Sequence, residues 1–202
     1  MTEPTKPSDP SISREGLLDR FLDELEAPAP SPCGGTAAAA AAAMAASLVV
    51  MVARGSAEWA DGAGIASQAR ALRSRLTALG DEDAAAFEHV IATMRKGNDA
   101  GTAERRDHAL GEALVQAAEV PLRIAEAAAD VAELAALAAS EGSPHLRPDA
   151  TAAATLAEAA VRAATHLVEI NLATVPGDHH SARAELLAAA AAAARARALG
   201  SA

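Results

Sequence analysis

Residues 36–53 read TAAAAAAAMAASLVVMVA, a run that contains no charge, no glycine and no proline. Alanine is the strongest helix former, so this run predicts a helix that begins at Thr36 as its cap and extends to about Arg54. A membrane span usually needs ~20 apolar residues, and alanine is only weakly hydrophobic. The run therefore indicates a buried core helix rather than a membrane helix.

The composition of the rest of the chain favours an all-α fold. The chain has 202 residues, of which 60 are alanine and only 1% are aromatic. A β-sheet protein needs many β-branched and aromatic residues, which are scarce here. Small side chains let helices approach closely, but each alanine buries little area. We therefore expect oligomerisation to add buried surface.

Charge and cysteine content exclude several classes of function. The formal net charge of −10 repels phosphate backbones, so we expect no nucleic-acid partner. Cys33 is the only cysteine, which excludes an intrachain disulfide and a thiolate-rich metal site. The six histidines are dispersed, so no metal is expected. Residues 1–15 lack the apolar core of a signal peptide, and a reducing cytoplasm is the simplest compartment.

The spacing of apolar residues, glycines and prolines predicts one domain of antiparallel helices over residues 15–199. Residues 1–14, rich in proline, serine and threonine, are expected to form a disordered tail. Gly80 is expected to end one helix, and Asp81 and Asp149 to cap the helices that follow them. The predicted helices cover residues 16–27, 36–54, 65–79, 81–95, 103–140, 149–174 and 181–199.

Asp83 interrupts an otherwise apolar helix face. Helical spacing places it on the same face as Phe87, Val90 and Met94. A carboxylate on such a face is either hydrogen-bonded to nearby backbone amides or held for acid–base chemistry. The spacing alone leaves both interpretations open.

Gly34 and Gly35 precede the alanine helix and follow a proline-rich stretch. Unpaired N–H groups at a helix start, with glycines that permit close approach, can bind an anion or a polar heterocycle. A Gly-Gly turn before a helix is also common without any ligand. Cys33 beside them is interpreted as a small buried or turn residue rather than a nucleophile, because no His or Asp accompanies it.

His166 and Asn171 lie on the flanks of the apolar stripe of the helix predicted over residues 149–174. A buried asparagine must find hydrogen-bond partners or a ligand. A buried histidine is more often a satisfied core residue than a ligand.

Several short motifs follow one another at spacings that resemble one known family. They are Phe21-Leu22, residues 32–39 (PCGGTAAA), residues 81–87 (DEDAAAF), Met94-Arg95, residues 118–122 (AEVPL), residues 147–149 (RPD) and residues 170–172 (INL). Together they are similar to the cyclodeaminase/cyclohydrolase family, which includes the C-terminal domain of formiminotransferase-cyclodeaminase and stand-alone methenyltetrahydrofolate cyclohydrolases.

The resemblance implies an all-helical, homodimer-forming domain that takes a tetrahydrofolate derivative as substrate, without a bound cofactor or metal. It makes Asp83 the acid/base residue of a cyclohydrolase or cyclodeaminase. It also implies that the substrate-binding residues are Gly34, Gly35, Thr36, Asp149 and Asn171, with His166 compensating for an asparagine that the family usually has at 167. The alternative is a non-catalytic helical folate-binding or scaffold protein, since the chain departs from the family pattern at Cys33, Pro148 and Leu167.

Overall fold

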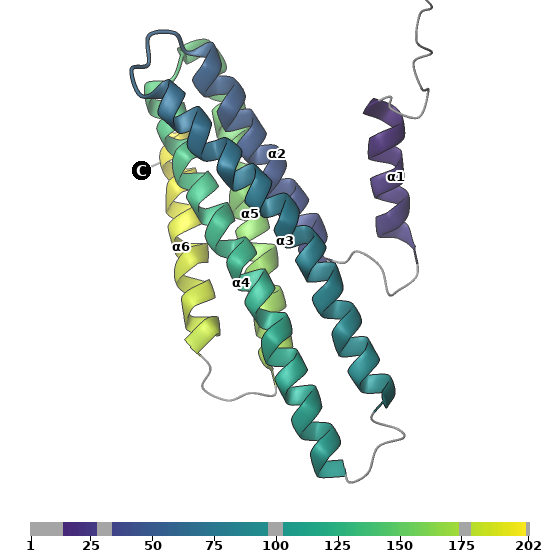
Figure 1. Cartoon of the computed structure of the whole chain (residues 1–202). Helices are drawn as coiled ribbons and strands as arrows, with labels where there is room; N and C mark the ends of the chain where they lie inside the picture. The colour runs from purple at the N-terminus through teal and green to yellow at the C-terminus, as the bar shows by residue number, and fades with distance from the viewer. Residues whose placement is uncertain (1–13, 28–33, 97–102, 174–178, 201–202) are drawn as a thin grey trace, which may run out of the picture.

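The computed structural model describes residues 14–27, 34–96, 103–173 and 179–200, and within these ranges every regular element is helical. The all-α prediction is therefore confirmed (Figure 1). The helices are α1 (Arg14–Glu26), α2 (Gly34–Gly55), α3 (Gly62–Lys96), α4 (Ala103–Glu141), the short 3-10 helix η2 (Pro144–Leu146), α5 (Arg147–Leu172) and α6 (His179–Leu199).

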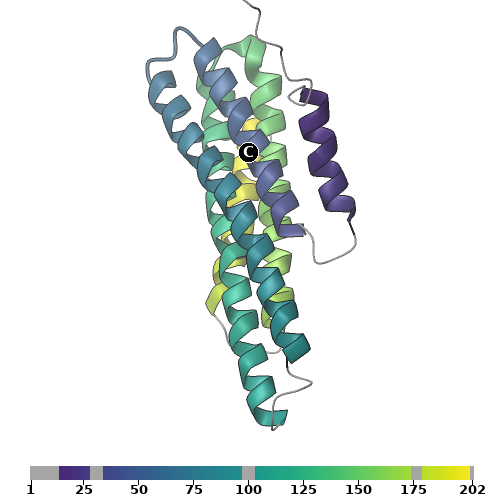
Figure 2. The same cartoon turned by 45° about the vertical axis from the view of Figure 1, so that its right-hand side comes forward.

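Helices α2 to α6 pack side by side as an elongated bundle, and α1 stands beside it (Figures 1 and 2). Helices α3 and α4 are the longest and extend together well beyond the start of α2. The first turn of α2 therefore lies against the middle of the bundle rather than at its end. This arrangement brings the start of α2 close to interior positions of α3 and α5.

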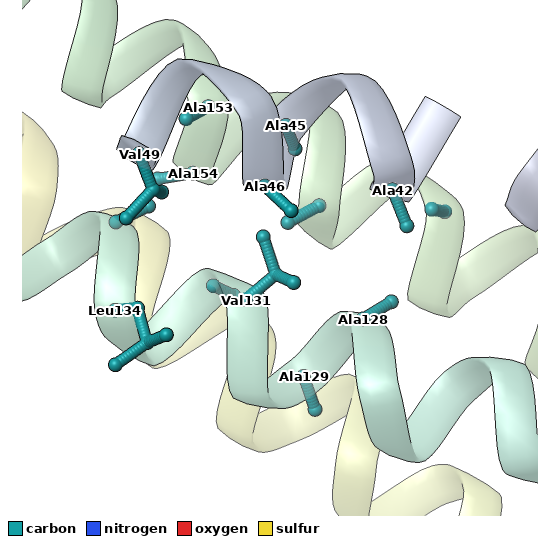
Figure 3. Packing of buried hydrophobic residues seen from close by; sticks show 14 of the residues in the cluster. Ala42, Ala45, Ala46, Val49, Ala128, Ala129, Val131, Leu134, Ala153 and Ala154 are labelled. Atoms are coloured by element: carbon teal, nitrogen blue, oxygen red, sulfur yellow. The ribbon is translucent and has the colours of Figure 1, made fainter. Parts of the chain in front are cut away.

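The core is built mainly from alanine. Ala42, Ala45 and Ala46 of α2 are completely buried and face Val131 of α4 and Ala153 of α5 (Figure 3). Small side chains at facing positions let the helix backbones approach closely, so many small contacts replace a few large ones. The largest completely buried side chains are Leu76, Leu79, Ile124, Val49, Val52, Val131, Val161, Val168 and Pro121.

Helix α2 is long and apolar enough to cross a membrane, judged by its length and composition. Its buried residues pack against α3, α4 and α5, as those of a core helix do. This packing is what we expect of a core helix.

The expected helix break at Gly80 is wrong, because α3 runs without interruption from Gly62 to Lys96. A glycine inside a helix costs about 1 kcal/mol relative to alanine, and tertiary packing readily offsets that cost. Here α2 packs beside Gly80: an added Cβ would be in ordinary van der Waals contact with α2, 3.6 Å from the Cβ of Ala39 and 3.7 Å from Cγ2 of Thr36. Asp81 therefore lies inside a helix instead of capping one.

Two other predicted caps are also corrected. Helix α2 already begins at Gly34, so Thr36 lies in its first turn and is buried. Helix α5 begins at Arg147 with Leu146 as its N-cap, which places Asp149 in the first helical turn. There its negative charge still interacts favourably with the helix dipole.

Candidate functional site

The carboxylate of Asp83 packs directly against the backbone of Gly35. A Cβ added to Gly35 would overlap the carboxyl carbon and both oxygens of Asp83, so any other residue at this position would displace Asp83 or α2. Asp83 is only 6% exposed. The aspartate that the sequence singled out and the Gly-Gly pair therefore meet, although they are far apart along the chain.

A hydrogen bond next to this contact joins the same two helices. The buried hydroxyl of Thr36 donates to the backbone carbonyl of Gly80 at 2.9 Å. Gly80 lies one helical turn before Asp83 on α3. The first turn of α2 therefore contacts α3 at two successive points, the hydrogen bond from Thr36 to Gly80 and the packing of Asp83 against the backbone of Gly35.

The start of α2 provides hydrogen-bond donors beside the Asp83 carboxylate. The first N–H groups of an α-helix have no acceptor within the helix, and the helix dipole makes this end partly positive. Gly34 is exposed and has no side chain to cover its backbone, whereas Gly35 is buried against Asp83. A carboxylate next to such donors can exchange a proton with a polar group that the donors hold in place.

Helix α5 forms another wall of this region. An added Cβ on Gly34 would lie 3.7 Å from both methyl groups of Leu167. Asn171 lies one turn further along α5, and its Nδ2 donates to the backbone carbonyl of Ala117 on α4 at 3.0 Å. The structure therefore brings the Leu167 to Asn171 segment towards the start of α2, and it shows Asn171 bonded to protein backbone.

Asp149 and His166 are not brought to this region within the chain. Asp149 lies near Leu146, which packs at Gly55, the last residue of α2. At 1.5 Å per residue, that end of α2 is about 30 Å from Gly35. Nδ1 of His166 lies 3.5 Å from Oε2 of Glu169, and the exposed ring lines a surface pocket between α5 and α6. A substrate-binding role for either residue stays a prediction.

Sequence reasoning paired Arg123 with Glu119 on its own helix and missed its ion pair with Glu82, the neighbour of Asp83. Both side chains are about half exposed, and the pair joins α3 to α4. The pair depends on how α3 and α4 pack, so the sequence carried no signal for it. In the described ranges, no cluster of three or more His, Cys, Asp or Glu side chains could hold a metal ion.

Comparisons with known proteins identify the family of the chain. The family described as formiminotransferase-cyclodeaminase matches residues 17–192. A methenyltetrahydrofolate cyclohydrolase from Methylorubrum extorquens is 34% identical over 163 residues, which cover 76% of this chain and 78% of that protein. The crystal structure of a formiminotetrahydrofolate cyclodeaminase from Thermotoga maritima is similar with a TM-score of 0.80 at 25% identity, over 91% of this chain and 94% of the other. The resemblance inferred from the short motifs is thus confirmed, and the chain belongs to the formiminotransferase-cyclodeaminase family.

Proposed function

We propose that this protein is a folate enzyme of one-carbon metabolism that acts on the carbon attached to N5 and N10 of a tetrahydrofolate derivative. Its reaction is that of a methenyltetrahydrofolate cyclohydrolase or a formimidoyltetrahydrofolate cyclodeaminase. The contact between Asp83 and Gly35 carries the proposal, because it places a buried carboxylate at a helix start suited to a polar heterocycle. The names of the two relatives support the same substrate class.

The two reactions share one reacting carbon. In the cyclohydrolase reaction, water adds to the 5,10-methenyl carbon, the bond from this carbon to N5 breaks, and 10-formyltetrahydrofolate and a proton are released. In the cyclodeaminase reaction, N10 attacks the carbon of the protonated N5-formimidoyl group, the N10 proton passes to the formimidoyl nitrogen, and the bond from the carbon to this nitrogen breaks. Ammonia leaves, and the 5,10-methenyl cation is formed. Both reactions pass through a tetrahedral adduct, so both need a base that takes up a proton and an acid that returns one.

Asp83 is assigned both proton transfers in this scheme. Its carboxylate takes the proton from the attacking water or from N10, and returns it to the nitrogen that leaves. The N–H groups at Gly34 and Gly35 hold the pterin ring system in reach of that carboxylate, and such positioning can contribute several kcal/mol to catalysis. Only protons move between protein and substrate, so the scheme requires no bound cofactor.

The test is the hydrolysis of 5,10-methenyltetrahydrofolate at near-neutral pH, followed as loss of its near-ultraviolet absorbance against a no-enzyme control. We expect Asp83→Asn to fold normally and to lose turnover. Asp81→Asn is the matched control, because Asp81 is an exposed aspartate two residues earlier on the same helix, and it should keep the wild-type rate. Retained turnover in Asp83→Asn would remove Asp83 from the mechanism.

A second assay separates the two reactions. If the methenyl substrate is not hydrolysed faster than in the control, release of ammonia from 5-formimidoyltetrahydrofolate is measured in the same way. Turnover in neither assay would contradict the proposed activity. In that case, thermal stabilisation of the protein by tetrahydrofolate would indicate a non-catalytic folate binder, and its absence a scaffold.

We also propose that the protein forms a homodimer. Several large apolar side chains are exposed on α1 and on the outer face of α2, namely Leu17, Leu18, Leu22, Met44 and Met51. Because each alanine in the core buries little apolar area, burying these larger side chains against a second copy would add to the stability of the protein. Light scattering should give twice the chain mass of 20.2 kDa, and a monomer at micromolar concentration would contradict this assignment.

A further inference from the structure

The hydroxyl of Thr36 makes a hydrogen bond that neither helix needs for its own formation. Its acceptor, the Gly80 carbonyl, lies inside the continuous helix α3. A carbonyl at such a position already accepts the N–H of the residue four positions later. The bond from Thr36 is therefore an additional link between α2 and α3, and it is buried.

Both branches of the Thr36 side chain contribute to this link. Oγ1 bonds to Gly80, and Cγ2 would lie 3.7 Å from a Cβ added at Gly80. A β-branched side chain has few χ1 rotamers in a helix, so Thr36 holds its hydroxyl in a fixed direction.

The link lies beside the contact between Asp83 and Gly35. Gly35 directly precedes Thr36, and Asp83 follows Gly80 by about one turn, a rise of about 5 Å along α3. A change in the spacing of α2 and α3 at Thr36 therefore moves the carboxylate relative to the N–H groups of the first turn of α2.

We propose that Thr36 is a positioning residue, whose hydroxyl, through the Gly80 carbonyl, fixes the Asp83 carboxylate against the start of α2. The inference rests on the proposed function and refines one of its expectations. The resemblance implied that Thr36 binds substrate, and the 9% of Thr36 that is exposed lines a pocket with Gly80 and Asp81. Its hydroxyl proton, however, is engaged by the Gly80 carbonyl. Thr36 acts on the reaction only through the placement of Asp83.

Three variants separate this role from substrate binding and from plain stability. Thr36→Val keeps the shape of the side chain and removes the hydrogen bond, and Thr36→Ser keeps the hydroxyl. Thr77→Val is the matched control, because the exposed Thr77 hydroxyl bonds to the Arg73 carbonyl of its own helix at 3.0 Å. The same chemical change there breaks no link between helices.

We expect Thr36→Val to lower kcat by about 10–100-fold, since small misplacements of reacting groups have effects of this size. KM should change little, and Thr36→Ser should restore most of kcat. The pH dependence of kcat should shift in Thr36→Val and stay unchanged in Thr77→Val. A role of Thr36 in stability alone would not shift this pH dependence. A raised KM with unchanged kcat would instead mean that the hydroxyl contacts substrate, and would overturn the inference. Loss of activity that Thr36→Ser does not restore would overturn it as well.

A second readout does not depend on turnover. The titration of the Asp83 carboxyl carbon can be followed by carbon-13 NMR, with Asp83→Asn used to assign its signal. We expect the titration to differ from wild type in Thr36→Val and to match it in Thr36→Ser and Thr77→Val. A wild-type protein inactive towards both folates would contradict the proposed function, while this comparison would still support or overturn the positioning role. Identical Asp83 titration curves in the wild type, Thr36→Val, Thr36→Ser and Thr77→Val would overturn the positioning role.

Discussion

Asn171 supplies the hydrogen bond that Pro121 cannot make. In a regular α-helix, the carbonyl of Ala117 accepts the N–H of the residue at position 121, but proline has no N–H. Nδ2 of Asn171, on α5, donates to this carbonyl at 3.0 Å. Pro121 is completely buried within α4, where water cannot replace the missing donor. Two of the motifs noted in the sequence are thus parts of one joint between α4 and α5.

This joint predicts the effect of removing the amide. Asn171→Leu should lower the free energy of unfolding by about 1–3 kcal/mol, because it leaves a buried carbonyl without a partner. Urea unfolding followed by circular dichroism measures the change.

The proline provides the control for that experiment. In Pro121→Ala, the N–H of residue 121 can donate to the Ala117 carbonyl again, so the added loss from Asn171→Leu should shrink. A double-mutant cycle measures this coupling. If Asn171→Leu costs the same in both backgrounds, the amide does not compensate for the proline.

The contact between Gly35 and Asp83 predicts that even one methyl group is not tolerated there. In Gly35→Ala the new Cβ would overlap the carboxylate, so either α2 or Asp83 must move. We expect at least about a 10-fold loss of cyclohydrolase turnover. The assay of methenyltetrahydrofolate hydrolysis measures it.

Gly111 offers the matched substitution. It lies inside α4, and an added Cβ would meet nothing within 4 Å. Gly111→Ala should therefore keep full activity and raise stability by about 0.5–1 kcal/mol, as alanine does in an open helix position. Equal effects of the two substitutions on turnover would show that the contact at Gly35 does not matter for the reaction.

The alanine core predicts a strong response to larger side chains. Ala46 is completely buried where α2 faces α4 and α5 (Figure 3), so Ala46→Leu must separate helices that are in close contact. We expect a loss of about 1–3 kcal/mol or more in thermal or urea unfolding. The same change at Ala71, which is exposed on α3, should alter stability by no more than about 0.5 kcal/mol. A tolerated Ala46→Leu would mean that the core is loosely packed.

Most of the fold could be predicted because local preferences and packing agree along most of the chain. High alanine content and apolar periodicity located the helices, and turn residues located most of their ends. The prediction failed at Gly80, where a residue that often ends a helix lies inside α3, packs against α2 and accepts the Thr36 hydroxyl at its carbonyl. Such a reason lies in another helix, so the local sequence cannot show it.

The candidate site was predictable only in part. Asp83 could be found because a carboxylate is out of place on an apolar face, and Gly34 and Gly35 because they begin the most apolar helix. The partners of Thr36 and Asn171 could not be found, since any carbonyl on a facing helix can accept such a bond. Which carbonyl accepts depends on how the two helices align. The bonded residues are 44 positions apart for Thr36 and Gly80, and 54 for Asn171 and Ala117.

Replacing Asp130, on α4, by asparagine is predicted to raise stability in a pH-dependent way. Partial burial raises the pKa of Asp130 above its ordinary value of 3.8. The positive charge of Arg75 lowers this pKa, the negative charge of Glu126 raises it, and Arg183 and Glu133 act in the same two directions, with a net upward shift. Both arginines also lie close to Glu126, at 4.0 and 3.5 Å, so that carboxylate competes with Asp130 for them.

The sign of the effect follows from proton linkage. Between its unfolded and its folded pKa, Asp130 binds a proton more strongly in the native state, so stability falls as pH rises through this interval. Above the folded pKa the full penalty for the charged form is present, and below about pH 3 it is absent, because the carboxyl is protonated in both states. Asp130→Asn should therefore raise the Tm at about pH 7 and leave it unchanged at about pH 3.

Removing any one negative charge from a chain with a net charge of −10 could also stabilise it, so Asp81→Asn, measured at both pH values, corrects for the general effect. A lower Tm for Asp130→Asn at neutral pH would show that the arginines outweigh burial, and that the charged Asp130 stabilises the packing of α4 against α3 and α6.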